Sequence, residues 1–177
     1  MESFKKATIS LYFLLVLFGF SESSRSILPH PQSKPQPLQS FKINNTQNAR
    51  SCSYTVTIKT SCGSPVYTRD QISIAFGDAY GNQVYIPRID DPSSRAFERC
   101  STDKYELNGP CTYPICYVYL YRRGYNGWVV DKVTIYSYSS RRSVTYNYRA
   151  MIPNDVWFGF NFCSGYHDEA VGSTAAM

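Results

Sequence analysis

The sequence predicts an all-β fold, an antiparallel β-sandwich stapled by disulfide bonds. Its 177 residues include 16 Tyr and 10 Phe, and no long segment places apolar residues at helical spacing. Short segments of alternating apolar and polar residues are instead separated by Gly, Pro and Asn, which is typical of many short strands. Six cysteines in so small a chain suggest a disulfide framework if the chain is exported.

Residues 1–23 predict that export. Lys5 and Lys6 precede an apolar run over 7–20, and the small residues Ser21 and Ser23 follow. This pattern is typical of a secretory signal peptide, cleaved here near Ser23. A retained membrane anchor is the alternative, but the run is shorter than the ~20 residues that a membrane-spanning helix needs. We therefore expect a secreted protein.

The composition divides the rest of the chain into a linker, a domain and a tail. Residues 24–50 are rich in Pro, Gln and Ser and predict an extended or disordered linker. Within it, Asn44 begins an Asn-Asn-Thr sequon and is a predicted glycosylation site. The folded domain is expected over 51–163, and residues 164–177 form a polar tail that we expect to be disordered.

Eight strands are predicted in the domain, at 54–59, 72–76, 83–87, 104–107, 115–121, 128–136, 143–149 and 156–163. The clearest stretch is 115–136, which we interpret as a hairpin because two glycines and an asparagine at 122–127 favour a chain reversal. In its first strand Val118 and Leu120 alternate with tyrosines, which gives the strand two distinct faces. Eight short strands separated by turns suggest two antiparallel sheets packed face to face.

All six cysteines lie in this domain: Cys52, Cys62, Cys100, Cys111, Cys116 and Cys163. Spacing alone leaves their pairing open. Cys52 would meet Cys163 if the first and last strands pair, and Cys62 would meet Cys100 if the first and fourth strands are neighbours. Cys111–Cys116 would then clamp the loop that enters the hairpin. A zinc site is the alternative, but the domain contains no histidine and no CxxC pair.

The domain offers few groups for catalysis. The two histidines, His30 and His167, lie in the linker and the tail, so no Ser-His-Asp or Cys-His arrangement is available in the domain. Asp90 and Asp91 are adjacent in a turn and do not face each other across a cleft. We predict that the protein is not an enzyme. Its net charge of +5 is scattered, which argues against nucleic acid as a partner and leaves anionic lipid or acidic polysaccharide open.

Loop oxygens suggest calcium as the one candidate cofactor. The candidate ligands are Asp70, Asp78, Asn82 and Asp103. Calcium takes six to eight hard oxygen ligands, which flexible loops can supply. The alternative is that these side chains shape turns by accepting hydrogen bonds from nearby backbone amides.

Aromatic side chains are the candidate ligand-binding residues. Tyr117, Tyr119 and Tyr121 would line one face of a strand and could stack on sugar rings. The alternative is that they cover the sheet as amphipathic side chains. Trp128 follows a turn and could dock on a membrane, or it could instead cap the core.

Several motifs occur in a recognisable order: CSYTV from Cys52, YTRDQIS from Tyr67, FGDAYGN from Phe76, FERC from Phe97, GPC from Gly109, GWVVDKV from Gly127 and VWFGFNFC from Val156. Over these residues the chain closely resembles the plant embryo-specific secreted proteins, whose domain is similar to PLAT, the lipoxygenase-homology domain. The resemblance implies a sandwich of two four-stranded sheets and a role in embryo or seed development.

The resemblance also implies a non-catalytic module that contacts membranes, lipids or proteins, sometimes with calcium. An aspartate before the second strand is a calcium ligand in such domains, and Asp70 matches it. Arg69 departs from the small residue usual there and disfavours a metal. We expect a monomeric binding module of the extracellular space or cell wall, with a membrane lipid or a protein as partner. A wall protein that binds polysaccharide through its tyrosine row is the alternative.

Overall fold

The computed structural model describes residues 34–43, 50–91 and 93–163. The predicted signal peptide, the Asn44 sequon and the tail after residue 163 lie outside them. These described residues form nine strands: β1 (Gln36–Pro37), β2 (Ser51–Thr60), β3 (Gln71–Gly77), β4 (Gln83–Ile86), β5 (Thr102–Pro110), β6 (Tyr117–Arg123), β7 (Val129–Ser137), β8 (Arg142–Met151) and β9 (Trp157–Asn161). Within the same ranges, no helix has the length and apolar character needed to cross a membrane.

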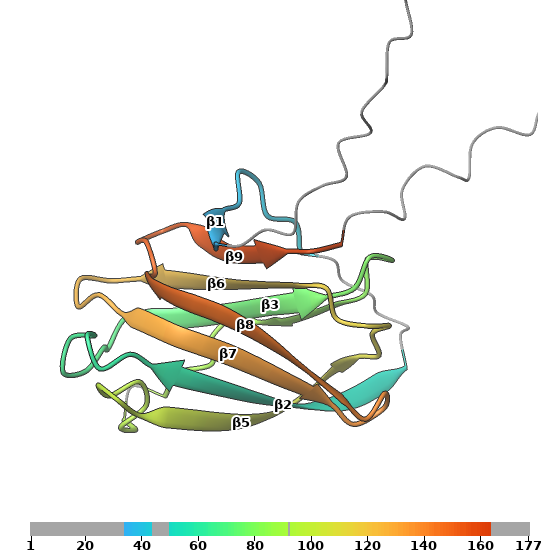
Figure 1. The fold of residues 1–177 in the computed structure, drawn as a ribbon, viewed down its shortest axis with the longest axis horizontal. Helices are drawn as coiled ribbons and strands as arrows, with labels where there is room; N and C mark the ends of the chain where they lie inside the picture. The colour runs from blue at the N-terminus through green and yellow to red at the C-terminus, as the bar shows by residue number, and fades with distance from the viewer. Residues whose placement is uncertain (1–33, 44–49, 92, 164–177) are drawn as a thin grey trace, which may run out of the picture. The chain divides into compact units, whose positions relative to one another are not determined.

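The strands form two antiparallel sheets, which confirms the predicted sandwich (Figure 1). One sheet has the order β1-β9-β6-β3-β4, and the other has the order β5-β2-β7-β8. Alternate side chains of both sheets meet in one core. Val56 and Ile58 of β2 and Ile74 of β3 belong to this core, and all three are fully buried.

The predicted hairpin over 115–136 is wrong, because its two strands lie in different sheets. β6 pairs with β3 and β9, whereas β7 pairs with β2 and β8. Both strands carry a buried apolar face, with Leu120 on β6 and Val133 on β7. Placing the strands in opposite sheets lets both faces cover the same core. The turn between them therefore crosses from one sheet to the other.

The ninth strand, β1, comes from the segment that composition predicted to be a linker. Gln36 and Pro37 pair with Gly159 and Phe158 of β9, and the Leu38 amide donates to the Trp157 carbonyl oxygen at 2.8 Å. β1 thus makes the sheet five-stranded where four strands were expected. A proline-rich segment is acceptable there because an edge strand does not need every amide for pairing.

The disulfide bonds are Cys52–Cys111, Cys62–Cys100 and Cys116–Cys163. The structure thus has the Cys62–Cys100 pair and neither of the other two pairs considered from the sequence. Cys52 lies opposite Gly109 in the β2–β5 ladder, which brings it to Cys111. The strand before Cys163 is the neighbour of β6 and not of β2, which brings Cys163 to Cys116.

Reduction of the three disulfides is expected to lower the melting temperature strongly. The bridges join residues 59, 38 and 47 positions apart. Each is worth ~2–4 kcal/mol through restriction of the unfolded chain, so we expect a fall of ~10 °C or more. Differential scanning fluorimetry with and without dithiothreitol measures this. Equal melting curves, with free thiols confirmed by labelling, would contradict it.

Candidate functional site

The predicted calcium ligands are divided between the two ends of the sandwich. Asp70 directly precedes β3 and Asp78 directly follows it, so the seven residues of β3 separate them by ~23 Å. We call the two ends the Asp70 end and the Asp78 end. The Asp70 end carries loops 61–70, 87–101, 124–128 and 152–156, and the Asp78 end carries loops 78–82, 111–116 and 138–141 (Figure 1).

Asp70 is buried in an ion pair. One carboxylate oxygen, Oδ2, accepts from Arg122 at 2.5 Å and from the Gly127 amide at 3.1 Å. The other, Oδ1, accepts from the Asn126 amide at 3.0 Å. Burial alone would raise the pKa of Asp70, but the hydrogen bonds from Asn126, Arg122 and Gly127 outweigh it and lower that pKa. Both oxygens thus already have donors from the protein.

The Arg122 guanidinium is held by two further oxygens. Its Nε donates to the Ile152 carbonyl at 2.9 Å, and Nη1 donates to the Gly124 carbonyl at 3.1 Å. Gly124 is required here, because a Cβ at its position would lie 2.1 Å from Oδ1 of Asp70 and its φ is +151°. The ion pair therefore ties together three loops of the Asp70 end.

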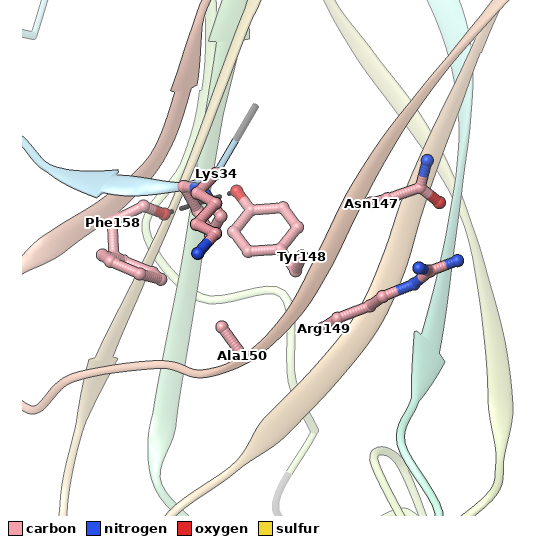
Figure 2. Close-up of a pocket in the computed structure, with 7 residues that line it drawn as sticks. Lys34, Asn147, Tyr148, Arg149, Ala150 and Phe158 are labelled. Atoms are coloured by element: carbon pink, nitrogen blue, oxygen red, sulfur yellow. Dashed lines mark hydrogen bonds between the residues drawn. The ribbon is translucent and has the colours of Figure 1, made fainter. Parts of the chain in front are cut away.

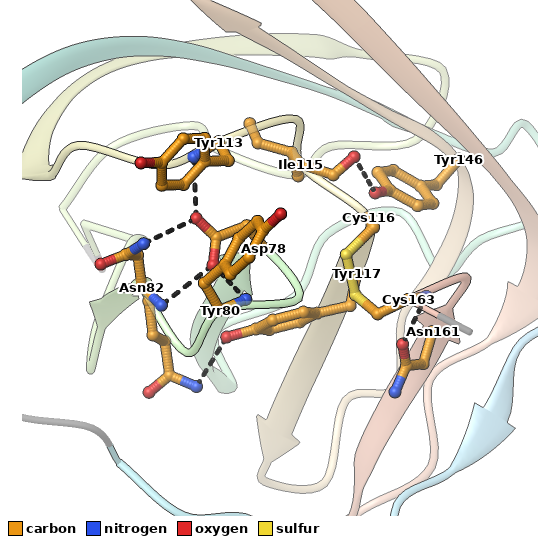
Figure 3. The surroundings of a disulfide bond; sticks show 11 residues. Asp78, Tyr80, Asn82, Tyr113, Ile115, Cys116, Tyr117, Tyr146, Asn161 and Cys163 are labelled. Atoms are coloured by element: carbon orange, nitrogen blue, oxygen red, sulfur yellow. Dashed lines mark hydrogen bonds between the residues drawn. A yellow bond between two sulfur atoms is a disulfide. The ribbon is translucent and has the colours of Figure 1, made fainter. Parts of the chain in front are cut away.

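Asp78 and Asn82 form a turn at the opposite end (Figure 3). The Asp78 carboxylate accepts from the amides of Tyr80 and Asn82 at 2.9 and 3.0 Å, and from the Asn82 side chain at 2.8 Å. It also accepts from the Tyr113 amide at 2.7 Å, which joins this turn to the β5–β6 loop. The rings of Tyr80 and Tyr113 lie side by side, with centroids 4.8 Å apart.

Asp103 shapes a third loop. Its Oδ2 accepts from the Ser101 hydroxyl at 2.8 Å and from the Phe97 amide at 3.1 Å. Phe97 has a φ of 60°, a left-handed conformation that such a hydrogen bond helps to hold. Asp103 therefore stabilises the conformation of the 87–101 loop.

The donor sets do not fit the predicted calcium site. The structure brings Asp78 and Asn82 together, but it places Asp70 and Asp103 at the other end, each with its own protein donors. Among the described residues, no group of three or more His, Cys, Asp or Glu could hold a metal ion. The alternative describes their geometry, because the three aspartates accept hydrogen bonds from nearby backbone amides and the Asn82 side chain donates to Asp78.

The predicted tyrosine row lies on the outer face of the five-stranded sheet, but it is unevenly exposed. Tyr119 is only 7% exposed, and its two neighbours across the sheet are the small residues Ala75 and Gly159. Tyr117 is half-buried, and burial raises its pKa to about 12 despite a hydrogen bond from Gln83. Burial and the nearby Asp155 carboxylate raise the pKa of Tyr121.

Tyr121 belongs to an aromatic cluster that sequence reasoning missed. Trp157 lies opposite it on β9, with ring centroids 5.3 Å apart. The Trp157 ring also stacks on Phe41 at 4.0 Å and lies 6.0 Å from Tyr85. The cluster joins β4, β6, β9 and the segment after β1. Only the ladder register could have revealed it, because these residues are far apart in the chain.

Trp128 lies in the core and not on the surface. It is fully buried, its Nε1 donates to the Thr60 hydroxyl at 3.0 Å, and its ring lies 4.6 Å from that of Phe97. The docking role considered for Trp128 is therefore wrong. In the β6–β7 turn, Tyr125 and Asn126 are exposed to solvent, whereas Trp128 is buried in the core.

Three exposed apolar or aromatic side chains in the loops of the Asp70 end were not predicted as functional. Val66 and Tyr67 are 61% and 49% exposed, and Tyr125 is fully exposed. Arg69 and Arg99 flank them, and neither forms an ion pair with an acidic residue in the described ranges. We call these five residues the docking tip. The sequence could have indicated Val66, Tyr67 and Tyr125, because they are apolar or aromatic and lie in loops that contain Gly or Pro.

The docking tip is held in place by the loops beneath it. The Cys62–Cys100 bridge joins its two outer loops, and the Arg99 amide donates to the Val66 carbonyl at 2.9 Å. The Arg69 amide donates to the Asn126 side chain at 3.2 Å, which connects the tip to the β6–β7 turn. The Arg69 guanidinium lies 5.4 Å from the centre of the Tyr67 ring. Such preorganisation lowers the cost of binding.

A cavity of about 620 Å³ lies beside β8 and β9 (Figure 2). The lining residues are Lys34, Pro35, Asn147, Tyr148, Arg149, Ala150 and Phe158. The Tyr148 hydroxyl lies 3.4 and 3.3 Å from the carbonyls of Val118 and Phe158 and donates to them. None of the described residues that line the cavity has a carboxylate that could act as a general acid or base.

Comparisons with known proteins place these observations in a family. A family model described as Embryo-specific protein 3 (ATS3) matches residues 39–163. The chain is similar to Embryo-specific protein ATS3B of Arabidopsis thaliana, with 49% identity over 166 residues that cover 93% of this chain and 87% of the relative.

The solved structures that share the fold include lipoxygenases. One lipoxygenase variant aligns with a TM-score of 0.54 and 22% identity, covering 63% of this chain and 16% of that chain. Coral 8R-lipoxygenase, whose structure is described in terms of calcium activation through a C2-like domain, aligns with a TM-score of 0.51 and 25% identity over 60% of this chain and 17% of that chain. The chain spans about a sixth of the length of these enzymes.

Proposed function

Because the chain belongs to the Embryo-specific protein 3 (ATS3) family, we propose that it is a secreted, non-catalytic PLAT-like module that docks on anionic membrane surfaces of the embryo or seed through its docking tip. Export is supported by the signal-peptide pattern and by three disulfide bonds, which persist in oxidising compartments. The family name supports a role in the embryo.

The observation that carries this proposal is the composition of the docking tip. Val66, Tyr67 and Tyr125 offer exposed apolar and amphipathic surface to a lipid interface. Arg69 and Arg99 lie beside them without carboxylate partners in the described part of the chain. Each arginine near an anionic membrane contributes ~1 kcal/mol. Together these side chains are suited to reversible binding of the protein to an anionic membrane.

Vesicle cosedimentation tests the proposal. The secreted form, with its disulfides intact, is mixed with vesicles of phosphatidylcholine alone or with added phosphatidylserine. The variant Val66→Ser/Tyr67→Ser/Tyr125→Ser is expected to bind the anionic vesicles about tenfold or more weakly, because it removes most of the apolar surface that would be buried.

The matched control is Tyr80→Ser/Tyr113→Ser, which removes an exposed aromatic pair from the Asp78 end. It is expected to bind like the unchanged protein. Equal loss in both variants, or no binding by any form, would contradict docking through the tip. In that case a protein partner would be the next candidate.

The aromatic cluster around Trp157 favours a second candidate function, binding of a wall polysaccharide on the outer face of the five-stranded sheet. Tyr85, Tyr121 and Trp157 are half-buried there and present rings suited to stacking on sugars. Under this function, Trp157→Ala would abolish retention on insoluble polysaccharide, whereas Tyr119→Phe, at a nearly buried position, would not change it. Unchanged retention of Trp157→Ala would eliminate this candidate.

A further inference from the structure

Three oxygens converge on the Arg122 guanidinium at the Asp70 end. They are Oδ2 of Asp70 at 2.5 Å, the Ile152 carbonyl at 2.9 Å and the Gly124 carbonyl at 3.1 Å. Each comes from a different loop: 61–70, 152–156 and 124–128, in that order. One carboxylate and two backbone carbonyls are the hard oxygen ligands that calcium takes in proteins.

We propose that Arg122 is a built-in cation that fills a cation site at the Asp70 end, so that these three loops are fixed without a divalent ion. This inference goes beyond membrane docking and does not depend on it. It also explains why these residues do not fit a calcium site. The three oxygens are present, but the positive charge of Arg122 already balances the negative charge of Asp70.

The burial of the pair argues that a metal does not displace Arg122. The Arg122 and Asp70 side chains are only 8% and 2% exposed. A guanidinium stays charged at any physiological pH, so an entering metal would leave a buried and unpaired cation next to its own charge. The other Asp70 oxygen accepts from the Asn126 amide, which leaves Oδ2 as the oxygen over which Arg122 and a metal would compete.

Of the arginines near Asp70, Arg122 is the one that pairs with it. Arg69, which precedes Asp70 in the chain and disfavoured a metal in the sequence reasoning, is exposed and lies over the Tyr67 ring. Arg123 points its guanidinium toward Asp155 instead, at 3.7 Å. The metal-disfavouring cation is therefore Arg122, which is 52 residues away from Asp70 in sequence.

Thermal unfolding with and without calcium tests the inference in the absence of lipid. The melting temperature of the unchanged protein is expected to be the same within about 1 °C in EDTA and in millimolar calcium. Arg122→Ala is expected to melt lower in EDTA and to regain part of the loss in calcium, because the three oxygens have then lost the cation that balances them. Arg122→Ala/Asp70→Asn is the matched control and should not respond.

Two results would overturn the inference. One is a calcium-dependent rise in the melting temperature of the unchanged protein that Asp70→Asn abolishes. The other is a folded Arg122→Ala that melts lower and ignores calcium. If Arg122→Ala does not fold, Arg122→Lys, which keeps a cation, must ignore calcium as the unchanged protein does. The readout is independent of vesicle binding, so failure here and failure of membrane docking are separate results.

Discussion

Asp70→Ala is expected to lower the free energy of unfolding by about 3–5 kcal/mol, which is the usual cost of breaking a buried ion pair by removing one partner. The substitution leaves the Arg122 guanidinium buried without its counter-charge, and it leaves the Asn126 and Gly127 amides without an acceptor. Urea unfolding monitored by tyrosine and tryptophan fluorescence measures the change. Asp91→Ala, at an exposed turn, is the control and is expected to cost much less.

The same pair predicts an acid-sensitive stability. Because the folded-state pKa of Asp70 is lowered below its ordinary value of 3.8, its contribution is complete above that value and is lost as the pH falls through the lowered pKa. The unchanged protein should therefore lose stability below about pH 4 more steeply than Asp70→Asn. Parallel acid-unfolding curves for the two proteins would show that Asp70 does not carry the effect.

Trp128→Ala is expected to cost about 3–5 kcal/mol, because it empties the space of the largest fully buried side chain. It also leaves the Thr60 hydroxyl without its indole donor. Trp128→Phe keeps most of the volume and should cost distinctly less. The comparison is made by thermal and urea unfolding, which report stability without any ligand.

Vesicle binding separates this structural role from a docking role. At a temperature where Trp128→Phe is folded, it should bind anionic vesicles as well as the unchanged protein, because Trp128 is not on the surface. Loss of vesicle binding with unchanged stability would mean that Trp128 contacts the membrane directly.

The sequence predicted the strands well because their alternation is a local property. Val118 and Leu120 alternate with tyrosines, and the structure places the first two in the core and the tyrosines on the other face. The eight predicted strands correspond to β2–β9, with ends shifted by a few residues. Local pattern does not reveal which strands pair, so the 115–136 segment was misread as a hairpin within one sheet.

The candidate site was harder to predict because it depends on contacts between distant residues. Arg122 and Asp70 are 52 positions apart, and only the β3–β6 register brings them together. The same holds for Trp157 and Tyr121, and for Cys116 and Cys163. Asp70 and Asp78 could have been separated from the sequence, because a strand was predicted between them at 72–76 and a strand places its ends far apart.

Hydrogen exchange with and without anionic vesicles tests the central claim, that the docking tip is the membrane-binding surface. Slowed exchange is expected in peptides covering 64–69 and 124–126, with no change in those covering 79–82 and 112–114 at the Asp78 end. Protection of the Asp78 end, or of β6 and β9 around Tyr121 and Trp157 with the tip unchanged, would contradict the account.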